Sequence, residues 1–542
     1  MPRTKLWPKM ALLLTCATLT SAVQIASPEP ANARTVTWAR AVEAPTLDPH
    51  AHDEGVSLTL NQQIYEPLLL RDAQGKTSPA LAEGWTTTSD PLTWEFRLRR
   101  NVLFHDGTPF TADDVVFSIA RAKTPQSGIK DLLASIEQVT PIDSHTIRIK
   151  TRSPTPLLPG SLTHVLVMSK AWAERNGVTQ VPTGQQTAQA HTFRNANGTG
   201  PFVLVSRVPG SRTVMRRHDT YWANAAAPVE ISELIYLPIP NDTERVQAFV
   251  QGEVDFLQDV PVNELPRLQA NKAVTVSIGA LNRTVFLGTQ VGPLAQTGGV
   301  EAPRNPLADK RVREAISMSL NRQLIQRSVL LGQAIPTGTV APPSINGYPR
   351  QLDRLPQVDL ARAKAIITDA GWPNGFQLRL DCPREGIVRA EAVCRSIAAQ
   401  LANAGITIDV VVRDAAQHLE HLRDDKAATD LFLSQVSVPS FDSELILLDI
   451  FHTRDKRAGR ANATRYSNSE LDKVIDSLAG QLDFSQRSQA IAQAWRIAHD
   501  EMIYIPLHVQ TVAYAMKPDL TINVDIENQP KLKFARVKMP IQ

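Results

Sequence analysis

Residues 104–115 read FHDGTPFTADDV, a stretch that combines a strand end, a turn, a helix cap and the start of a helix. The pair Asp106-Gly107 predicts the turn, because both residue types tolerate positive φ. Thr111 offers a side-chain oxygen that can cap a helix, and the two acidic residues after it suit the positive end of the helix dipole. A helix with an apolar stripe is therefore predicted from residue 112.

The sequence on either side continues this mixture of short strands and helices. Before the turn, apolar and polar residues alternate from Leu92 to Arg99, which predicts a half-buried strand. Farther along, capping residues and periodicity predict further elements. These are helices at 309–320, 359–371, 388–405 and 485–502, and strands at 406–412 and 503–516. This mixed order predicts an α/β fold.

Composition and charge exclude several classes of partner. The chain has 542 residues, 43% of them hydrophobic and 20% charged, which suggests a globular protein of two or three domains. The formal charge is only +3, without a long basic run, so nothing favours nucleic acid or anionic lipid. After the N-terminal region no apolar stretch approaches the length of about 18 residues that spans a membrane. We expect a mature chain without direct membrane insertion.

The N-terminus has the pattern of a secretory signal peptide. Basic residues precede an apolar run from residue 10 to residue 23, and Ala31-Asn32-Ala33 supplies a small-x-small cleavage site. We therefore expect residues 1–33 to be a signal peptide that is removed on export. Cys16 loosely fits a lipoprotein cleavage box, but Thr15 is a poor residue before it, so a lipid anchor is not expected.

Two cysteines, Cys382 and Cys394, remain in the mature chain. In an oxidising compartment they can form a disulfide, and the alternative is a pair of buried free thiols. A zinc site is not expected, because no histidine or further cysteine lies at ligand spacing. The histidine pairs at 50/52 and 418/421 also lack a third ligand at fixed spacing. We predict the disulfide, no metal site and no cofactor.

A series of short motifs carries a family resemblance. In chain order the motifs are TLDPH (46–50), QIYEPL (63–68), PALAEGW (79–85), FRLRR (96–100) followed by residues 104–115, GTGPF (198–202), YW (221–222), GEVD (252–255), DKRVR (309–313) and YSN (466–468). From about residue 35 to the C-terminus, this ordered series resembles the family 5 extracellular solute-binding proteins, the oligopeptide- and dipeptide-binding group.

The resemblance implies an α/β, two-lobe periplasmic-binding-protein fold with mixed sheets, a hinge and an additional inserted subdomain. Lobe I is expected to be discontinuous, built from 34–68, 190–285 and 503–542. The inserted subdomain is expected at 69–189 and lobe II at 286–502. Stretches rich in Pro and Gly near 153–160 and 292–306 are candidate crossings between the lobes.

The implied function is the extracytoplasmic substrate-binding component of an ABC importer for peptides or related small solutes. Such a protein is periplasmic, is expected to be monomeric, and delivers its ligand to permease subunits that work with a cytoplasmic ATPase. The solute could instead be a nickel complex, haem, an opine, glutathione or an oligosaccharide. An enzyme, or a signalling or chaperone protein on the same scaffold, is the rival class. No nucleophile elbow or His-Glu-x-x-His motif supports an enzyme.

The resemblance also places one segment at the ligand. In the peptide binders an Asp between the Cys-containing helix and the Tyr-Ser-Asn motif anchors the amino terminus of the ligand. The usual Trp-Gly-Ala-Asp-Tyr pattern is absent here, Pro439 stands at the anchor position, and Asp442 follows three residues later. Either Asp442 replaces the anchor or the ligand has no free amine there. Alternatively, Asp442 caps a helix that starts near Glu444.

Six residues are therefore candidate ligand contacts, and no catalytic residue is predicted. Four of the six come from the segment around the anchor position: Gln435, Ser437, Ser440 and Asp442. The other two, Glu43 and Ala44, belong to a predicted strand that leads to Leu47. In family members the backbone of this strand pairs with an extended peptide.

Export gives a first test. When the chain is expressed with its leader in a Gram-negative host, the exported protein should begin at Arg34, because signal peptidase recognises small-x-small sites after a short apolar run. N-terminal sequencing or intact mass measurement checks this. An exported chain that begins with an acylated Cys16, or that retains Met1, would contradict the prediction.

Overall fold

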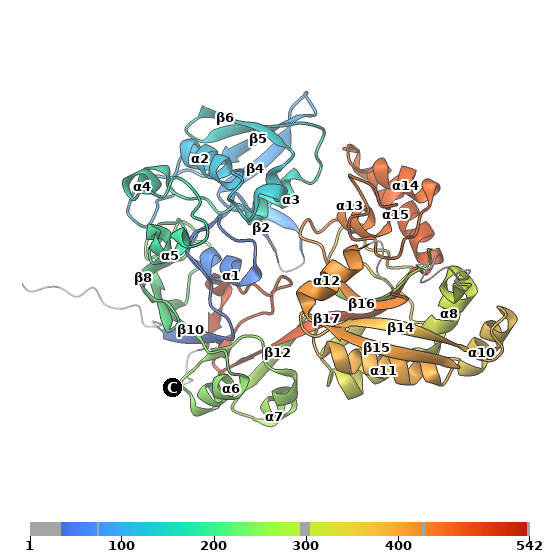
Figure 1. Cartoon of the computed structure of the whole chain (residues 1–542). Helices are drawn as coiled ribbons and strands as arrows, with labels where there is room; N and C mark the ends of the chain where they lie inside the picture. Colours follow the sequence, from blue (N-terminus) through green and yellow to red (C-terminus); the bar gives the residue numbers. More distant parts are fainter. Residues whose placement is uncertain (1–33, 73–74, 293–303, 425–428, 539–542) are drawn as a thin grey trace, which may run out of the picture.

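The computed structural model describes residues 34–72, 75–292, 304–424 and 429–538. The predicted signal peptide and Cys16 lie outside the described residues. The described chain forms two lobes side by side, and long strands run from one lobe into the other (Figure 1). A separate small sheet stands above the first lobe in this view.

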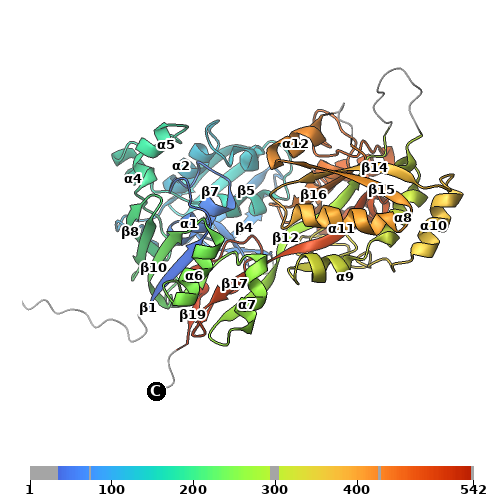
Figure 2. The same ribbon diagram turned by 60° about the horizontal axis from the view of Figure 1, so that its bottom comes forward.

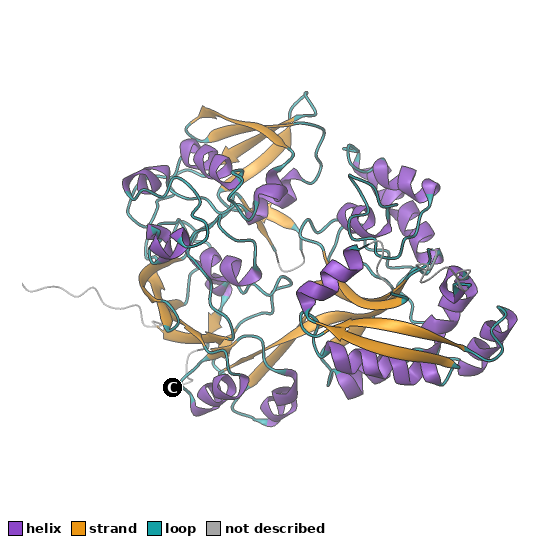
Figure 3. Cartoon of the chain, in the orientation of Figure 1, coloured by secondary structure: helices purple, strands orange, loops and turns teal. Residues whose placement is uncertain are grey.

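A single mixed sheet passes through both lobes. Within the described residues it has eleven strands, ordered β15-β14-β16-β12-β17-β11-β1-β10-β9-β8, with β13 also paired to β17. The strands are β1 (Arg34–Arg40), β8 (Phe202–Val208), β9 (Arg212–Arg217), β10 (Ile231–Pro238), β11 (Phe256–Leu257), β12 (Thr275–Thr289), β13 (Ala334–Pro336), β14 (Phe376–Pro383), β15 (Ile406–Arg413), β16 (Leu431–Ser437) and β17 (Tyr504–Met516). The α/β class predicted from the sequence is therefore present (Figure 3).

Strands β12 and β17 link the lobes. They pair antiparallel along most of their length, but the register shifts between Ala280 and Thr284 of β12. The apolar core changes at the same place: Leu281 packs into the core of lobe I, whereas Val285 packs into that of lobe II. On β17 the same change occurs between residues 507 and 512. The chain therefore passes from one lobe to the other a few residues away from the predicted boundaries at 285/286 and 502/503.

Lobe I gathers segments that are far apart in the sequence. Its helices are α1 (Gly55–Ile64), α6 (Asp242–Gln251) and α7 (Leu265–Ala270), and a short pair β18 (Leu520–Thr521) and β19 (Arg536–Val537) returns near the C-terminus. The buried carboxylate of Glu66 accepts hydrogen bonds from Trp222 at 2.7 Å and from Lys533 at 3.2 Å. One buried acceptor thus joins the N-terminal, middle and C-terminal parts of this lobe.

The glycine motif at 198–202 is a packing device against the end of α1. A Cβ atom on Gly198 would lie 2.1 Å from the carbonyl oxygen of Ile64, so only glycine fits. The backbone N–H of Gly200 donates to the same carbonyl at 2.9 Å. This agrees with the tight turn expected for the motif.

The inserted subdomain is built around the FHDGTPFTADDV stretch. Its sheet has the order β4-β5-β7-β6 and packs on α2. Gly107 has a φ of +82°, and the Asp114 carboxylate accepts hydrogen bonds from the N–H (2.9 Å) and hydroxyl (3.1 Å) of Thr111. The predicted turn is confirmed, and so is the cap, because Thr111 is the N-cap of α2 and forms a capping box with Asp114. The elements are β2 (Leu69–Arg71), β3 (Thr77–Pro79), β4 (Ala82–Thr87), β5 (Thr93–Leu98), β6 (Ile136–Asp143), β7 (Thr146–Thr151), α2 (Ala112–Ala122), α3 (Leu158–Ser161), α4 (Lys170–Arg175) and α5 (Gln186–Gln189).

Lobe II packs helices on both sides of β14, β15 and β16 (Figure 2). The helices are α8 (Lys310–Ser319), α9 (Arg322–Leu324), α10 (Leu360–Asp369), α11 (Ala390–Ala402), α12 (Ala415–Arg423), α13 (Ser443–Ile446), α14 (Ser469–Asp476) and α15 (Phe484–Asp500). The four helices predicted from capping signals are confirmed as α8, α10, α11 and α15.

One expected crossing is wrong. Residues 153–160 lead from β7 into α3 inside the subdomain, and the paired strands β12 and β17 make the crossing instead. Much of the other candidate stretch, 292–306, lies outside the described residues.

Cys382 at the end of β14 and Cys394 in α11 form a disulfide, with their Cα atoms 6.4 Å apart. The bond closes a loop across a sequence separation of 12 residues and ties the helix to the sheet that it covers. Both residues are fully buried in the core of lobe II.

Removing this disulfide should lower the free energy of unfolding by about 2–3 kcal/mol, because the open loop gains conformational entropy in the unfolded chain. Chemical unfolding of the Cys382→Ser/Cys394→Ser variant against the oxidised wild type measures the loss. Quantitative thiol labelling of denatured, unreduced wild type should find no free thiol in the mature chain. Two reactive thiols in that sample would contradict the bond.

Candidate functional site

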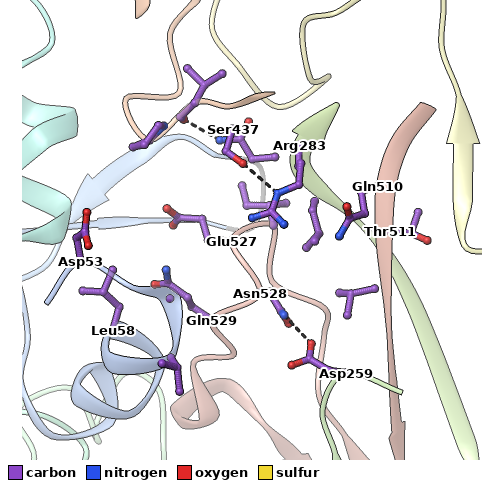
Figure 4. A pocket seen from close by; sticks show the side chains of 18 of the residues that line it. Asp53, Leu58, Asp259, Arg283, Ser437, Gln510, Thr511, Glu527, Asn528 and Gln529 are labelled. Atoms are coloured by element: carbon purple, nitrogen blue, oxygen red, sulfur yellow. Dashed lines mark hydrogen bonds between the residues drawn. The ribbon is translucent and has the colours of Figure 1, made fainter. Parts of the chain in front are cut away.

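A cavity of about 740 Å³ lies between the two lobes, where the paired strands β12 and β17 pass from one lobe to the other (Figure 4). Lobe I contributes Arg40, the start of α1 and residues 259–262. The inserted subdomain adds residues 128, 129, 131 and 132 and His164, and the C-terminal segment adds 526–529. Lobe II contributes Gln333, Val388 and residues 437–439. The cavity therefore has walls from both lobes, and the linking strands form one side of it.

Several buried polar atoms on this wall have no hydrogen-bond partner within the described residues. They are the Gln333 Nε2, Gln510 Oε1 and Thr511 Oγ1 atoms, and each of these residues is at most 8% exposed. All three residues line the cavity. A buried polar group without a partner costs free energy, so this wall is suited to a polar ligand that supplies the missing bonds.

The ionic groups around the cavity differ in their pairing. Arg40 donates to Asp259 at 2.7 Å, and Asn528 donates to the same carboxylate at 2.6 Å, so this corner is electrically balanced. Arg283 donates from Nε to the Ser437 hydroxyl at 3.0 Å and has no carboxylate partner in the described part of the chain. Figure 4 shows Arg283 beside Ser437, with Glu527 to the left of both.

Glu527 is itself shared between two basic side chains. Its carboxylate lies 3.7 Å from His164 Nε2 and 4.0 Å from Arg71 Nε. Burial lowers the pKa of His164, and the Glu527 carboxylate opposes that shift only in part. The imidazole is therefore neutral at neutral pH.

The lobes also touch directly at the edge of the cavity. The Arg71 guanidinium of the subdomain stacks on the Phe441 ring of lobe II, 3.9 Å from its centroid. The same guanidinium donates to the Pro439 carbonyl at 3.4 Å and to Thr163 at 3.2 Å. This cation–π contact joins the two walls without any ligand.

Comparisons with known proteins agree with this architecture. The family model described as bacterial extracellular solute-binding proteins, family 5 Middle, matches residues 76–457. The chain belongs to this family. It is 25% identical over 485 residues to the glutathione-binding protein GsiB of Salmonella choleraesuis strain SC-B67, covering 88% of this chain and 89% of the relative.

Solved structures share the fold of this family 5 chain. HbpA2 from Haemophilus parasuis superposes with a TM-score of 0.79 at 19% identity, covering 93% of this chain and all of that one. DppA from Helicobacter pylori, an ABC transporter-associated periplasmic binding protein in complex with the peptide STSA, gives a TM-score of 0.68 at 20% identity. That alignment covers 94% of this chain and 98% of the other. The two-lobe fold predicted from the resemblance is confirmed.

Only part of the segment expected to contact the ligand lines the cavity. Ser437 and Pro439 line the cavity, whereas Gln435, Ser440 and Asp442 are not among its lining residues. Gln435 donates to the Gly386 carbonyl at 3.1 Å, which holds its side chain within lobe II. The carbonyl of Ser440 faces Gly160 of the subdomain.

Asp442 has a well-defined structural role in this family 5 chain. Its carboxylate caps α13 by accepting from the Glu444 N–H at 2.9 Å, as one of the two interpretations predicts. It also accepts from Arg487 at 2.6 Å and from Asn346 at 2.8 Å, and the residue is only 4% exposed. These bonds leave the carboxylate committed to lobe II.

Glu43 and Ala44 also lie outside the cavity lining. The predicted strand through them is wrong, because β1 ends at Arg40. Arg207 explains this local structure: it donates to the Ala44 carbonyl and to the Glu43 carboxylate, which also accepts from the Gly210 N–H at 2.7 Å. The segment is thereby held against β8 and β9.

Sequence reasoning missed Arg283, Gln510 and Glu527 as cavity residues. Each stands in a stretch whose pattern describes only a strand or a turn.

Metal ligation has no support in the described ranges, where no group of three or more His, Cys, Asp or Glu side chains is arranged to hold an ion. In the same ranges, no helix has the length and apolar character needed to cross a membrane.

The geometry of Asp442 gives a stability prediction. Asp442→Asn should lower the free energy of unfolding by about 2 kcal/mol, because it weakens a charged hydrogen bond to the buried Arg487 while Glu444 still pairs with that arginine at 2.8 Å. Asp483→Asn is the matched control, since Asp483 caps α15 in an exposed position and should cost less than about 1 kcal/mol. Chemical unfolding of both variants measures the difference. Equal losses would show that the Arg487 pair contributes nothing beyond the cap.

Proposed function

We propose that this protein is the periplasmic substrate-binding component of an ABC importer, and that it takes small peptides or peptide-like solutes. The solute binds in the cavity between the lobes and is delivered to permease subunits powered by a cytoplasmic ATPase. Export through the predicted signal peptide places the protein in the compartment where such a receptor works.

The main support for the proposal is the cavity between the lobes, beside the linking strands β12 and β17. It has the size typical of small-molecule sites. Both lobes line it, so closing them around a hinge encloses the ligand. Unpartnered polar atoms of Gln333, Gln510 and Thr511 offer both a donor and acceptors to a solute with peptide-like polarity.

The relatives support this solute class. GsiB is named for glutathione, a short peptide, and the DppA structure contains the peptide STSA. Neither relative determines the ligand of this chain, since the identities are 25% and 20%. A panel of dipeptides, tripeptides and glutathione is therefore the appropriate first screen, with thermal stabilisation as the readout.

Filling the cavity should weaken binding. Ser437 is exposed to the cavity, so Ser437→Phe places an aromatic ring in the solute volume with little effect on the core. We expect at least a tenfold weaker affinity, about 1.4 kcal/mol or more, for any peptide that stabilises the wild type. Isothermal titration measures the change.

Ser206→Phe is the matched control, because it makes the same substitution at an exposed position of β8 outside the cavity. It should bind as the wild type does. Unchanged affinity in Ser437→Phe would remove the cavity as the binding site. A wild type that responds to no member of the panel would contradict the peptide class.

A further inference from the structure

Arg283 is unusual among the arginines around the cavity in having no acidic partner. Arg40 pairs with Asp259 at 2.7 Å, and Arg71 lies 4.0 Å from Glu527. For Arg283 the described residues provide one hydrogen bond, from Nε to Ser437. The two terminal nitrogens of its guanidinium therefore have all their donors available on the side that lines the cavity.

The backbone explains why the side chain points there. Three residues of β12, 281–283, stand opposite the single residue Gln510 of β17, because the pairing passes from Ala280↔Thr511 to Thr284↔Val509. Such an irregularity turns side chains out of the normal alternation. The extra length is held by the Asn282 N–H, which donates to the Ile526 carbonyl at 2.8 Å, and by the Asn282 side chain, which donates to the Val438 carbonyl at 2.7 Å.

The surroundings of Arg283 also contain acceptors and donors that need a partner. Gln510 and Thr511 follow on the neighbouring strand, and Figure 4 shows both on the same side of the cavity as Arg283. Their Oε1 and Oγ1 atoms are buried and have no hydrogen-bond partner among the described residues. These unpaired groups beside Arg283 are a separate observation that this region suits a polar ligand.

Desolvation makes the guanidinium more dependent on a partner. Burial lowers the pKa of Arg283 below its usual range, and no neighbouring carboxylate opposes this shift. Arg283 itself is half-buried. Arg322 is almost fully buried, and its guanidinium donates to three backbone carbonyls and a hydroxyl, which satisfy it internally. Arg283 has no such set of acceptors.

We propose that Arg283 is the anchor for a carboxylate group of the solute and that the binding site therefore selects anionic or zwitterionic ligands. A planar guanidinium matches a carboxylate with two parallel hydrogen bonds, and the Ser437 hydroxyl holds its Nε so that the two terminal nitrogens face the ligand. Glu527 also lines the cavity, so the charged groups of a zwitterion have separate partners. This inference rests on the proposed function, because it assumes that the solute enters this cavity.

The test uses one peptide from the screen in two forms, with a free C-terminal carboxylate and as the C-terminal amide. Isothermal titration compares wild type, Arg283→Lys and Arg283→Gln. The wild type should bind the acid about 10- to 100-fold more tightly than the amide. Arg283→Gln should lose that preference while retaining the amide affinity, and Arg283→Lys should retain part of the preference. Arg212→Gln removes an exposed arginine of β9 outside the cavity and should behave as the wild type.

Each outcome separates the two proposals. If Arg283→Gln distinguishes acid from amide as well as the wild type does, the Arg283 assignment is overturned and the cavity remains a peptide site. If no peptide binds the wild type, the peptide function fails, and a panel of non-peptide carboxylic acids with their amides decides the assignment by thermal shift. An acid that stabilises the wild type but not Arg283→Gln supports the anchor. Equal responses of the two proteins to every acid, including no response, overturn it.

Discussion

The antiparallel pairing of β12 with β17 is the constraint on which the arrangement of the two lobes depends. Each strand is long enough to enter both hydrophobic cores, and each changes core at the same level. The lobes are rigid because their interiors are separate and close-packed. The strands pass from one core to the other at the short irregular stretch of residues 281–283, opposite Gln510. The cavity lies at this same level, so the groups that meet a solute are built into the element that sets the angle between the lobes.

Placing a binding surface on linking strands has an energetic consequence. At the irregular stretch the Gln510 Oε1 atom has no hydrogen-bond partner among the described residues, and the Arg283 side chain has one, the Ser437 hydroxyl. Unsatisfied buried groups lower the stability of the empty protein and strengthen its interaction with a partner that pairs with them. Elsewhere in the fold the opposite solution is used: the buried carboxylates of Glu66 and Asp442 are bonded within the protein, where both join distant segments and Asp442 also caps α13.

Local patterns in the sequence predicted local structure well. The turn at Gly107, the cap at Thr111 and the helices α8, α10, α11 and α15 each depend on residues that are close in the chain. Long-range geometry decided the rest. The choice between anchor and cap for Asp442 depends on Arg487, which lies 45 residues away. The role of Arg283 depends on the register between two strands more than 200 residues apart, which no pattern within β12 records. The strand expected at Glu43 is wrong because Arg207 on β8, which restrains it, lies 164 residues away and leaves no signal in the local sequence.

The contact of Arg71 with Phe441 affects the ligand affinity of this protein through the fraction of molecules in which the lobes are closed. The apparent dissociation constant of a two-state receptor is the intrinsic constant divided by the fraction of molecules already in the binding-competent arrangement. A stacked guanidinium is worth about 0.5–2 kcal/mol, so if opening the lobes breaks this contact, it multiplies the ratio of closed to open molecules by about 2- to 30-fold. Closure and recognition are thus encoded by different residues, and evolution can tune how tightly the receptor holds a solute without altering which solute it selects.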